Sequence, residues 1–128
     1  MKEYLFDISK VSSLNDWWDM YLDVVSGDGK EYFGRNRDAY SDSLSGGPGC
    51  PEYPCRFIFI NAGKVKHEDL IKWTIQELKI KKTKCHSSWI KIIDMQIELL
   101  ESGIGESLHH WILDPLIGNS CIETIIKS

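Results

Sequence analysis

Apolar residues recur along the chain with two spacings, one typical of strands and one typical of helices. Residues 4–8 and 56–61 are short, mostly apolar runs that predict strands, and residues 121–127 predict a third strand. The run at 56–61 is almost continuously apolar, which is typical of a strand covered on both faces in a parallel sheet. The sequence therefore predicts at least one central, well-buried strand.

The clearest helix is predicted between Leu14 and Val25, where apolar residues recur every three or four positions. Ser13 is a suitable N-cap, with Asp16 at the capping-box position three residues later. Trp17 and Trp18 follow the apolar period, so we expect both in the core and not at a binding site. Gly27 is the expected end of this helix.

Further helical segments follow. Asn36 is the expected N-cap of a helix that runs to about Ser45, and the Gly- and Pro-rich stretch after it ends that helix. Other helices are expected at residues 67–81, 88–101 and 106–113.

The order of these elements is strand, two helices, strand, several helices and strand. Strands separated by helices pair in parallel through helical crossovers. We therefore expect an α/β fold, with a small three-stranded parallel sheet, helices packed on it and an enlarged helical region before the last strand. The length of 128 residues favours a single domain, 1–128.

The negative charge of the chain is concentrated in its first part. Residues 1–55 carry ten acidic and five basic residues, a net charge of −5, whereas residues 56–128 carry nine acidic and ten basic residues, a net charge of +1. A nucleic-acid-binding protein needs a basic surface, so direct nucleic-acid binding is not expected. The distribution suits a basic partner, although a merely solvated acidic surface explains it equally well.

Neither a membrane span nor a secretory signal is expected, because no run of 18 apolar residues occurs and the first residues carry acids. The four cysteines are widely spaced, which favours reduced thiols and a cytoplasmic location over a disulfide framework.

A metal site and an enzyme active site are both disfavoured. Cys50 and Cys55 are four residues apart, but no second ligand pair has a recognised zinc spacing, so no metal and no cofactor is expected. A zinc-stabilised domain or small zinc enzyme remains the third-ranked alternative. No nucleophile motif occurs, and the Gly-rich stretch 46–49 follows a helix and lacks the Lys of a phosphate loop. We therefore expect a protein that is not an enzyme.

Two carboxylates stand out on the predicted second helix. Asp38 and Asp42 are four residues apart, so they share one face although like charges repel there. Asp38 benefits from the positive end of the helix dipole near Asn36, whereas Asp42 gains little from it. Tyr32 precedes the helix and can lie on the same side. This combination indicates a protein-binding face, with a solvated helix surface as the simpler alternative.

The stretch from Tyr32 to Leu44, YFGRNRDAYSDSL, resembles the inhibitory loop and helix of the barstar family of intracellular ribonuclease inhibitors. The resemblance also covers residues 1–61 more broadly, including Glu52-Tyr53-Pro54 before the second strand, and the closing strand at 120–128. Between these parts the chain is about thirty residues longer than the family's pattern, by comparison of ordinary loop lengths. Arg35 and Arg37 add positive charges that the pattern lacks, and this leaves open which ribonuclease is the target.

The resemblance implies an inhibitor, antitoxin or immunity protein that blocks a cognate ribonuclease, which can be a toxin domain. It implies that Asp42 enters the nuclease active site in place of an RNA phosphate, and that Asp38 and Tyr32 add contacts. Asn36 and Gly46 belong to the same expected partner-binding stretch. The alternative is a protein-interaction module on this fold whose partner is not a nuclease.

Overall fold

Three parallel strands form the sheet, as the sequence predicts. The structure is a computed structural model that describes all 128 residues. The strands β1 (Lys2–Asp7), β2 (Cys55–Ile60) and β3 (Ile122–Ile126) lie in the order β1-β2-β3, with β2 in the centre. Both pairings are parallel, and the predicted α/β class is therefore confirmed.

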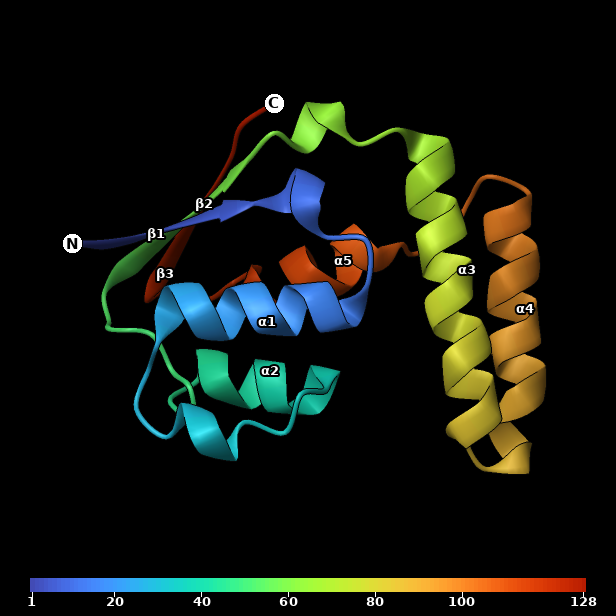
Figure 1. Cartoon of the computed structure of the whole chain (residues 1–128), viewed down its shortest axis with the longest axis horizontal. Helices are drawn as coiled ribbons and strands as arrows, with labels where there is room; N and C mark the ends of the chain where they lie inside the picture. Colours follow the sequence, from blue (N-terminus) through green and yellow to red (C-terminus); the bar gives the residue numbers. More distant parts are fainter.

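One face of this sheet is covered and the other is open. Phe6 of β1 and Phe57 and Phe59 of β2 are fully buried beneath the helices. The side chains that alternate with them are half-buried or exposed, and Leu5 is 55% exposed. The expectation that β2 is covered on both faces is therefore wrong. The longer helices all lie on one side of the sheet (Figure 1). The apolar side chains of β2 on the other face, Ile58 and Ile60, are only half-buried.

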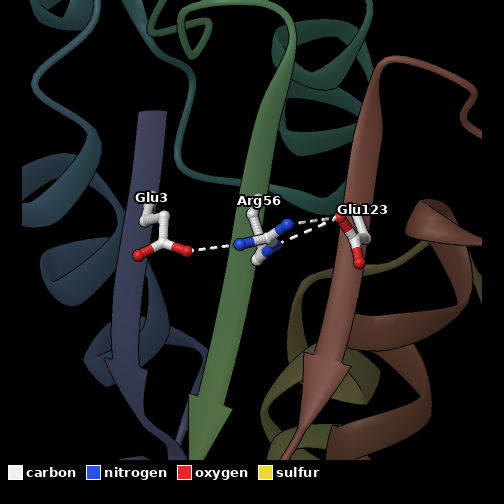
Figure 2. A network of polar contacts seen from close by, with 3 residues as sticks. All are labelled: Glu3, Arg56 and Glu123. Carbon is white, nitrogen blue, oxygen red and sulfur yellow. Dashed lines mark hydrogen bonds and ion pairs between the residues drawn. The ribbon is translucent and has the colours of Figure 1, made fainter. Parts of the chain in front are cut away.

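A charged ladder crosses the open face of the sheet. Arg56 of β2 donates to Glu3 of β1 at 2.5 Å and, through Nε and Nη2, to Glu123 of β3 at 3.0 Å (Figure 2). These three residues are direct cross-strand neighbours, because Glu3 pairs with Arg56 and Arg56 pairs with Glu123. Opposite charges placed this way favour the observed register.

The first helix, α1 (Leu14–Val25), begins as the sequence predicts, with the side chain of Ser13 accepting a hydrogen bond from the Asp16 N–H at 3.0 Å. It ends at Val25, and Ser26, one residue before the expected Gly27, takes the left-handed conformation (φ 46°) and caps it. Gly27 serves a different purpose, since a Cβ there would lie 1.9 Å from the carbonyl oxygen of Cys50.

The remaining helices are α2 (Arg37–Leu44), α3 (His67–Lys84), α4 (Ile90–Glu101) and α5 (Leu108–Leu113). Compared with the sequence prediction, α3 ends three residues later, and α4 and α5 each begin two residues later. Short 3-10 turns cover Ile8–Lys10, Lys30–Tyr32, Ala62–Lys64, Ser87–Trp89 and Asp114–Leu116. None of the helices combines the length and the apolar character that crossing a membrane requires.

The α3–α4 hairpin, which belongs to the enlarged helical region, stands beside the rest of the molecule (Figure 1). It is joined to α5 by a buried hydrogen bond in which the Leu108 N–H donates to the Thr74 hydroxyl at 2.9 Å. On the other side of the molecule, α1 and α2 pack over the sheet through a cluster of aromatic side chains. Its fully buried members are Phe6, Trp17, Tyr21, Tyr40, Phe57 and Phe59.

Candidate functional site

The predicted acidic helix is present as α2, and Asn36 caps it as the sequence predicts. The side-chain Oδ1 of Asn36 accepts from the Ala39 N–H at 2.8 Å, and its Nδ2 donates to the Gly34 carbonyl at 3.1 Å. Both ends of the Asn36 amide are therefore used within the chain. Its function in this structure is to fix where the helix begins.

The inner face of α2 is anchored by buried hydrogen bonds as well as by apolar packing. Tyr40 is fully buried, and its hydroxyl donates to the Ile112 carbonyl of α5 at 2.7 Å. Burial raises the pKa of Tyr40 well above its ordinary value. The hydroxyl of Ser43, also fully buried, lies 2.9 Å from the hydroxyl of Tyr21 on α1. These contacts determine which side of α2 faces the core.

The C-terminal end of α2 is held from two distant segments. The Tyr53 hydroxyl, in the loop before β2, donates to the carbonyls of Ser43 and Leu44 at 3.1 and 2.7 Å. The Asn119 amide also donates to the Leu44 carbonyl, at 3.2 Å. The last carbonyls of a helix have no partner within it, so these contacts satisfy groups that would otherwise need water.

Asp38 and Asp42 occupy the opposite, solvent-exposed face of α2. Successive residues are about 100° apart around a helix, so these two carboxylates point away from buried Tyr40 and Ser43. Both aspartates are exposed, and neither makes an ion pair or a side-chain hydrogen bond within the chain. The structure thus presents two exposed carboxylates, one helical turn apart, that form no ion pair.

The two arginines near the start of α2 make their direct contacts with other elements and not with this pair. Arg35 donates to Asp19 of α1 at 2.9 Å and to Asn15 at 3.2 Å. The guanidinium of Arg37 lies over the Trp111 ring of α5, 4.8 Å from its centroid, and burial lowers its pKa. Their positive charges therefore flank the carboxylates of Asp38 and Asp42 without neutralising them through direct contact.

Tyr32 and Gly46 stand at the two ends of the stretch that contains α2. Tyr32 ends a 3-10 turn and is 76% exposed, while the next residue, Phe33, is buried against Trp18 and Tyr21. Gly46 is exposed, with φ 103°, a conformation that favours glycine. All five expected site residues are thus on the surface, and α2 brings Asp38 and Asp42 together.

The sequence did not predict a cleft of about 580 Å³ between α2 and α3. Trp18 and Trp111 contribute to its walls, and Glu77 in it accepts a hydrogen bond from the Leu14 N–H at 2.5 Å. Cationic side chains outnumber the acidic ones there. The charged residues that line it are Arg35, Arg37, Asp38, Glu77, Lys81 and Lys84. A positively charged hollow therefore adjoins the acidic face of α2.

The cysteines and histidines are not grouped as metal ligands. All four cysteines are unpaired thiols, and burial raises the pKa of Cys55 to about 11. No three His, Cys, Asp or Glu side chains are grouped so that they could hold a metal ion. The Gly-rich stretch after α2 forms turns, in which the Gly47 N–H donates to the Asp42 carbonyl at 2.8 Å.

No protein-family model matches the chain, and no curated protein matches it. The arrangement of its own residues around α2 is therefore the basis on which its function is inferred.

Proposed function

We propose that the protein is an inhibitor of a ribonuclease, acting as an antitoxin or immunity protein that blocks the nuclease active site with α2. The observation that carries the proposal is the exposed pair of carboxylates, Asp38 and Asp42, which form no ion pair within the chain. The resemblance of the Tyr32–Leu44 stretch to the barstar family supports the same assignment. The partner is a cognate ribonuclease, and binding requires neither a cofactor nor catalysis by this chain.

The chemistry of the target explains why carboxylates suit it. A ribonuclease holds RNA phosphates with Arg, Lys and His, so its active site is a cationic cleft. Carboxylates can accept charge-assisted, often bidentate hydrogen bonds from the same groups. Asp42 then occupies the position of a phosphate, with Asp38 and Tyr32 making adjoining contacts. The protein thus competes with the RNA substrate for the same cationic groups.

The way α2 is held favours tight binding. Its start is capped by Asn36, its inner face is anchored by Tyr40 and Ser43, and its last carbonyls accept from Tyr53. A binding surface that is already ordered loses little conformational entropy when a partner binds.

The decisive experiment measures inhibition of purified microbial ribonucleases by the full chain and by two matched variants. Asp42→Ala removes the proposed central carboxylate, and Asp23→Ala removes an exposed carboxylate of α1. Losing one side of a desolvated charge pair typically costs about 3 kcal/mol or more, a weakening of at least about a hundredfold. We expect this loss for Asp42→Ala and nearly unchanged inhibition for Asp23→Ala.

Circular dichroism of both variants checks that the fold is intact. Inhibition that is equally strong in Asp42→Ala and in the unaltered protein contradicts the proposed mechanism. A neighbouring reading frame that encodes a ribonuclease or a large secreted toxin would identify the cognate target to test first.

The second candidate is an interaction module whose partner is not a nuclease. The cationic cleft favours it, because Arg37, Lys81 and Lys84 lie next to the acidic face and would repel a purely cationic partner. The double variant Lys81→Glu/Lys84→Glu separates the two candidates. If the target is a ribonuclease with a uniformly cationic surface, this variant should inhibit it as well as or better than the unaltered protein does. If the partner places an acidic segment in the cleft, the variant should no longer bind it.

A further inference from the structure

The outer side of α4 carries an apolar stripe that no part of the chain covers. Ile92, Met95 and Leu99 are 46%, 56% and 46% exposed, and their spacing of three and four residues places them along one side of the helix. The inner side of α4 is also apolar, since Ile93, Ile97 and Leu100 are buried. A helix that is apolar on more than one side usually has more than one packing partner.

Additional exposed apolar residues extend this stripe at both ends. Trp89, in the turn before α4, is 55% exposed. Ile104, after the helix, is 61% exposed, and its N–H donates to the Leu99 carbonyl at 3.0 Å, which keeps it beside the stripe. Contiguous apolar surface of this kind indicates an interaction site more often than do scattered apolar residues. Figure 1 shows α4 at the outer edge of the molecule, with α3 on its inner side.

The charged residues beside the stripe indicate which kind of partner packs on it. Lys91 and Glu98 are exposed, lie on the same flank of α4, and make no ion pair within the chain. They are seven residues, about 10.5 Å, apart along the helix axis, so they are not suitably placed to pair with each other. The nearby Asp94 is already paired with Lys82 at 2.6 Å.

We infer that α4 pairs with α4 of a second copy of this chain in a two-fold, antiparallel arrangement. A two-fold interface brings the same surface of both copies together, and the antiparallel direction reverses the order of residues along one helix. With Met95 near the axis, Ile92 of one copy then packs near Leu99 of the other. Lys91 of each copy comes within one residue's rise of Glu98 of the other, so the flank is self-complementary in charge.

This interface is separate from α2, because α3 lies between α4 and the rest of the molecule (Figure 1). A dimer formed in this way leaves Asp38 and Asp42 accessible on both copies, so the inference does not depend on the proposed function. The helix that carries the stripe is about 18 Å long, which corresponds to a small, weak interface. We expect a reversible equilibrium with a dissociation constant on the order of 10 μM to 100 μM.

Sedimentation equilibrium of the full chain tests the inference. The protein concentration should run from about 5 μM to about 500 μM, so that it spans the expected dissociation constants. The unaltered protein should shift from monomer to dimer as its concentration rises, and Met95→Glu should remain monomeric. Leu5→Glu is the matched control, because Leu5 is equally exposed at 55% but lies on the open face of the sheet. It should dimerise as the unaltered protein does.

Charge reversal provides the second, independent test. Lys91→Glu and Glu98→Lys should each raise the dissociation constant by roughly three- to tenfold, because each places like charges opposite one another. The double variant Lys91→Glu/Glu98→Lys restores opposite charges and should restore dimerisation. A protein that stays monomeric throughout the range, a dimer broken by Leu5→Glu instead, or a double variant as weak as the single variants would overturn the inference.

Discussion

The hydroxyl of Tyr53 donates to the carbonyl oxygen of Leu44 at 2.7 Å, and this contact joins the loop before β2 to the last residue of α2. The same hydroxyl also donates to the Ser43 carbonyl at 3.1 Å. Tyr53 is only 39% exposed, so its ring is partly shielded by the chain. The candidate binding helix is therefore held at its C-terminal end by a residue outside it.

Replacing this hydroxyl should weaken the attachment of α2 and so destabilise the protein. Tyr53→Phe keeps the ring and removes one donor that serves two carbonyls, which should lower the free energy of unfolding by about 1 kcal/mol. Urea denaturation measures this change. Tyr32→Phe is the control, since Tyr32 is 76% exposed and its hydroxyl has no partner in the chain. Equal stability of Tyr53→Phe and the unaltered protein would mean that water replaces the hydroxyl without loss.

The N-terminal end of α2 should be equally sensitive to its cap. Asn36→Ala removes the acceptor of the Ala39 N–H and should destabilise the protein by about 1 kcal/mol. Asn36→Asp keeps an acceptor at this position and should retain most of the stability. Thermal unfolding followed by circular dichroism distinguishes them. If the alanine and aspartate variants melt together, the side-chain cap contributes nothing measurable.

Gly27 should tolerate no larger residue, because the backbone of Cys50 passes beside it. A Cβ at position 27 would lie 1.9 Å from the Cys50 carbonyl oxygen, and backbone cannot move aside as a flexible side chain can. Gly27→Ala should therefore destabilise the protein by about 3 kcal/mol or more. Gly63→Ala is the comparison, because its nearest neighbour is the side chain of Ser128 at 3.3 Å. Chemical denaturation of both variants should show a large loss only for position 27.

Stability should fall as the solution becomes mildly acidic, and His109 should contribute to the loss. Burial lowers the pKa of His109, neighbouring His110 lowers it further, and its Nε2 is buried without a hydrogen-bond partner. Below the ordinary histidine pKa of about 6.5, the unfolded chain gains a proton that the folded chain resists. The contribution of neutral His109 to the free energy of unfolding is therefore complete above that pH. It declines as the pH falls toward the pKa of His109 in the folded protein.

Urea denaturation at about pH 7.5 and pH 5.5, on either side of the ordinary histidine pKa, measures this effect. His109→Leu should lose less stability between the two conditions than the unaltered protein does. His67→Gln changes an exposed histidine at the start of α3 and should keep the original pH dependence. An identical pH dependence in all three proteins would exclude a contribution from His109.

Local signals made much of the fold predictable. Ser13 and Asn36 act as helix caps through bonds to residues three positions later, so both starts can be inferred from nearby sequence. The 3.6-residue period likewise placed Trp17 and Trp18 in the core, where they are 0% and 3% exposed. Parallel pairing of the three strands followed from the alternation of strands and helices, whereas their order in the sheet was not predicted.

Features that depend on distant segments could not be predicted in the same way. The apolar run of β2 does not specify how many faces helices cover, because helix placement is decided by the connections between strands. The cleft brings Arg37 next to Lys81 and Lys84, which are more than forty positions away in the sequence. The support of α2 by Tyr53 and Asn119 also arises only on folding. The acidic pair itself was visible because Asp38 and Asp42 are one helical turn apart.

The hydrogen bonds that hold α2 determine how easily the helix separates from the rest of the molecule. Ser43 is hydrogen-bonded to Tyr21 of α1, and Tyr40 is hydrogen-bonded to Ile112 of α5. The Leu44 carbonyl accepts hydrogen bonds from Tyr53 and Asn119, which lie in two different loops. Separating α2 from the molecule thus breaks contacts with most of its other parts at once. The amide hydrogens in the middle of this eight-residue helix should therefore exchange with solvent deuterium about as slowly as those of central strand β2, although short surface helices usually exchange much faster.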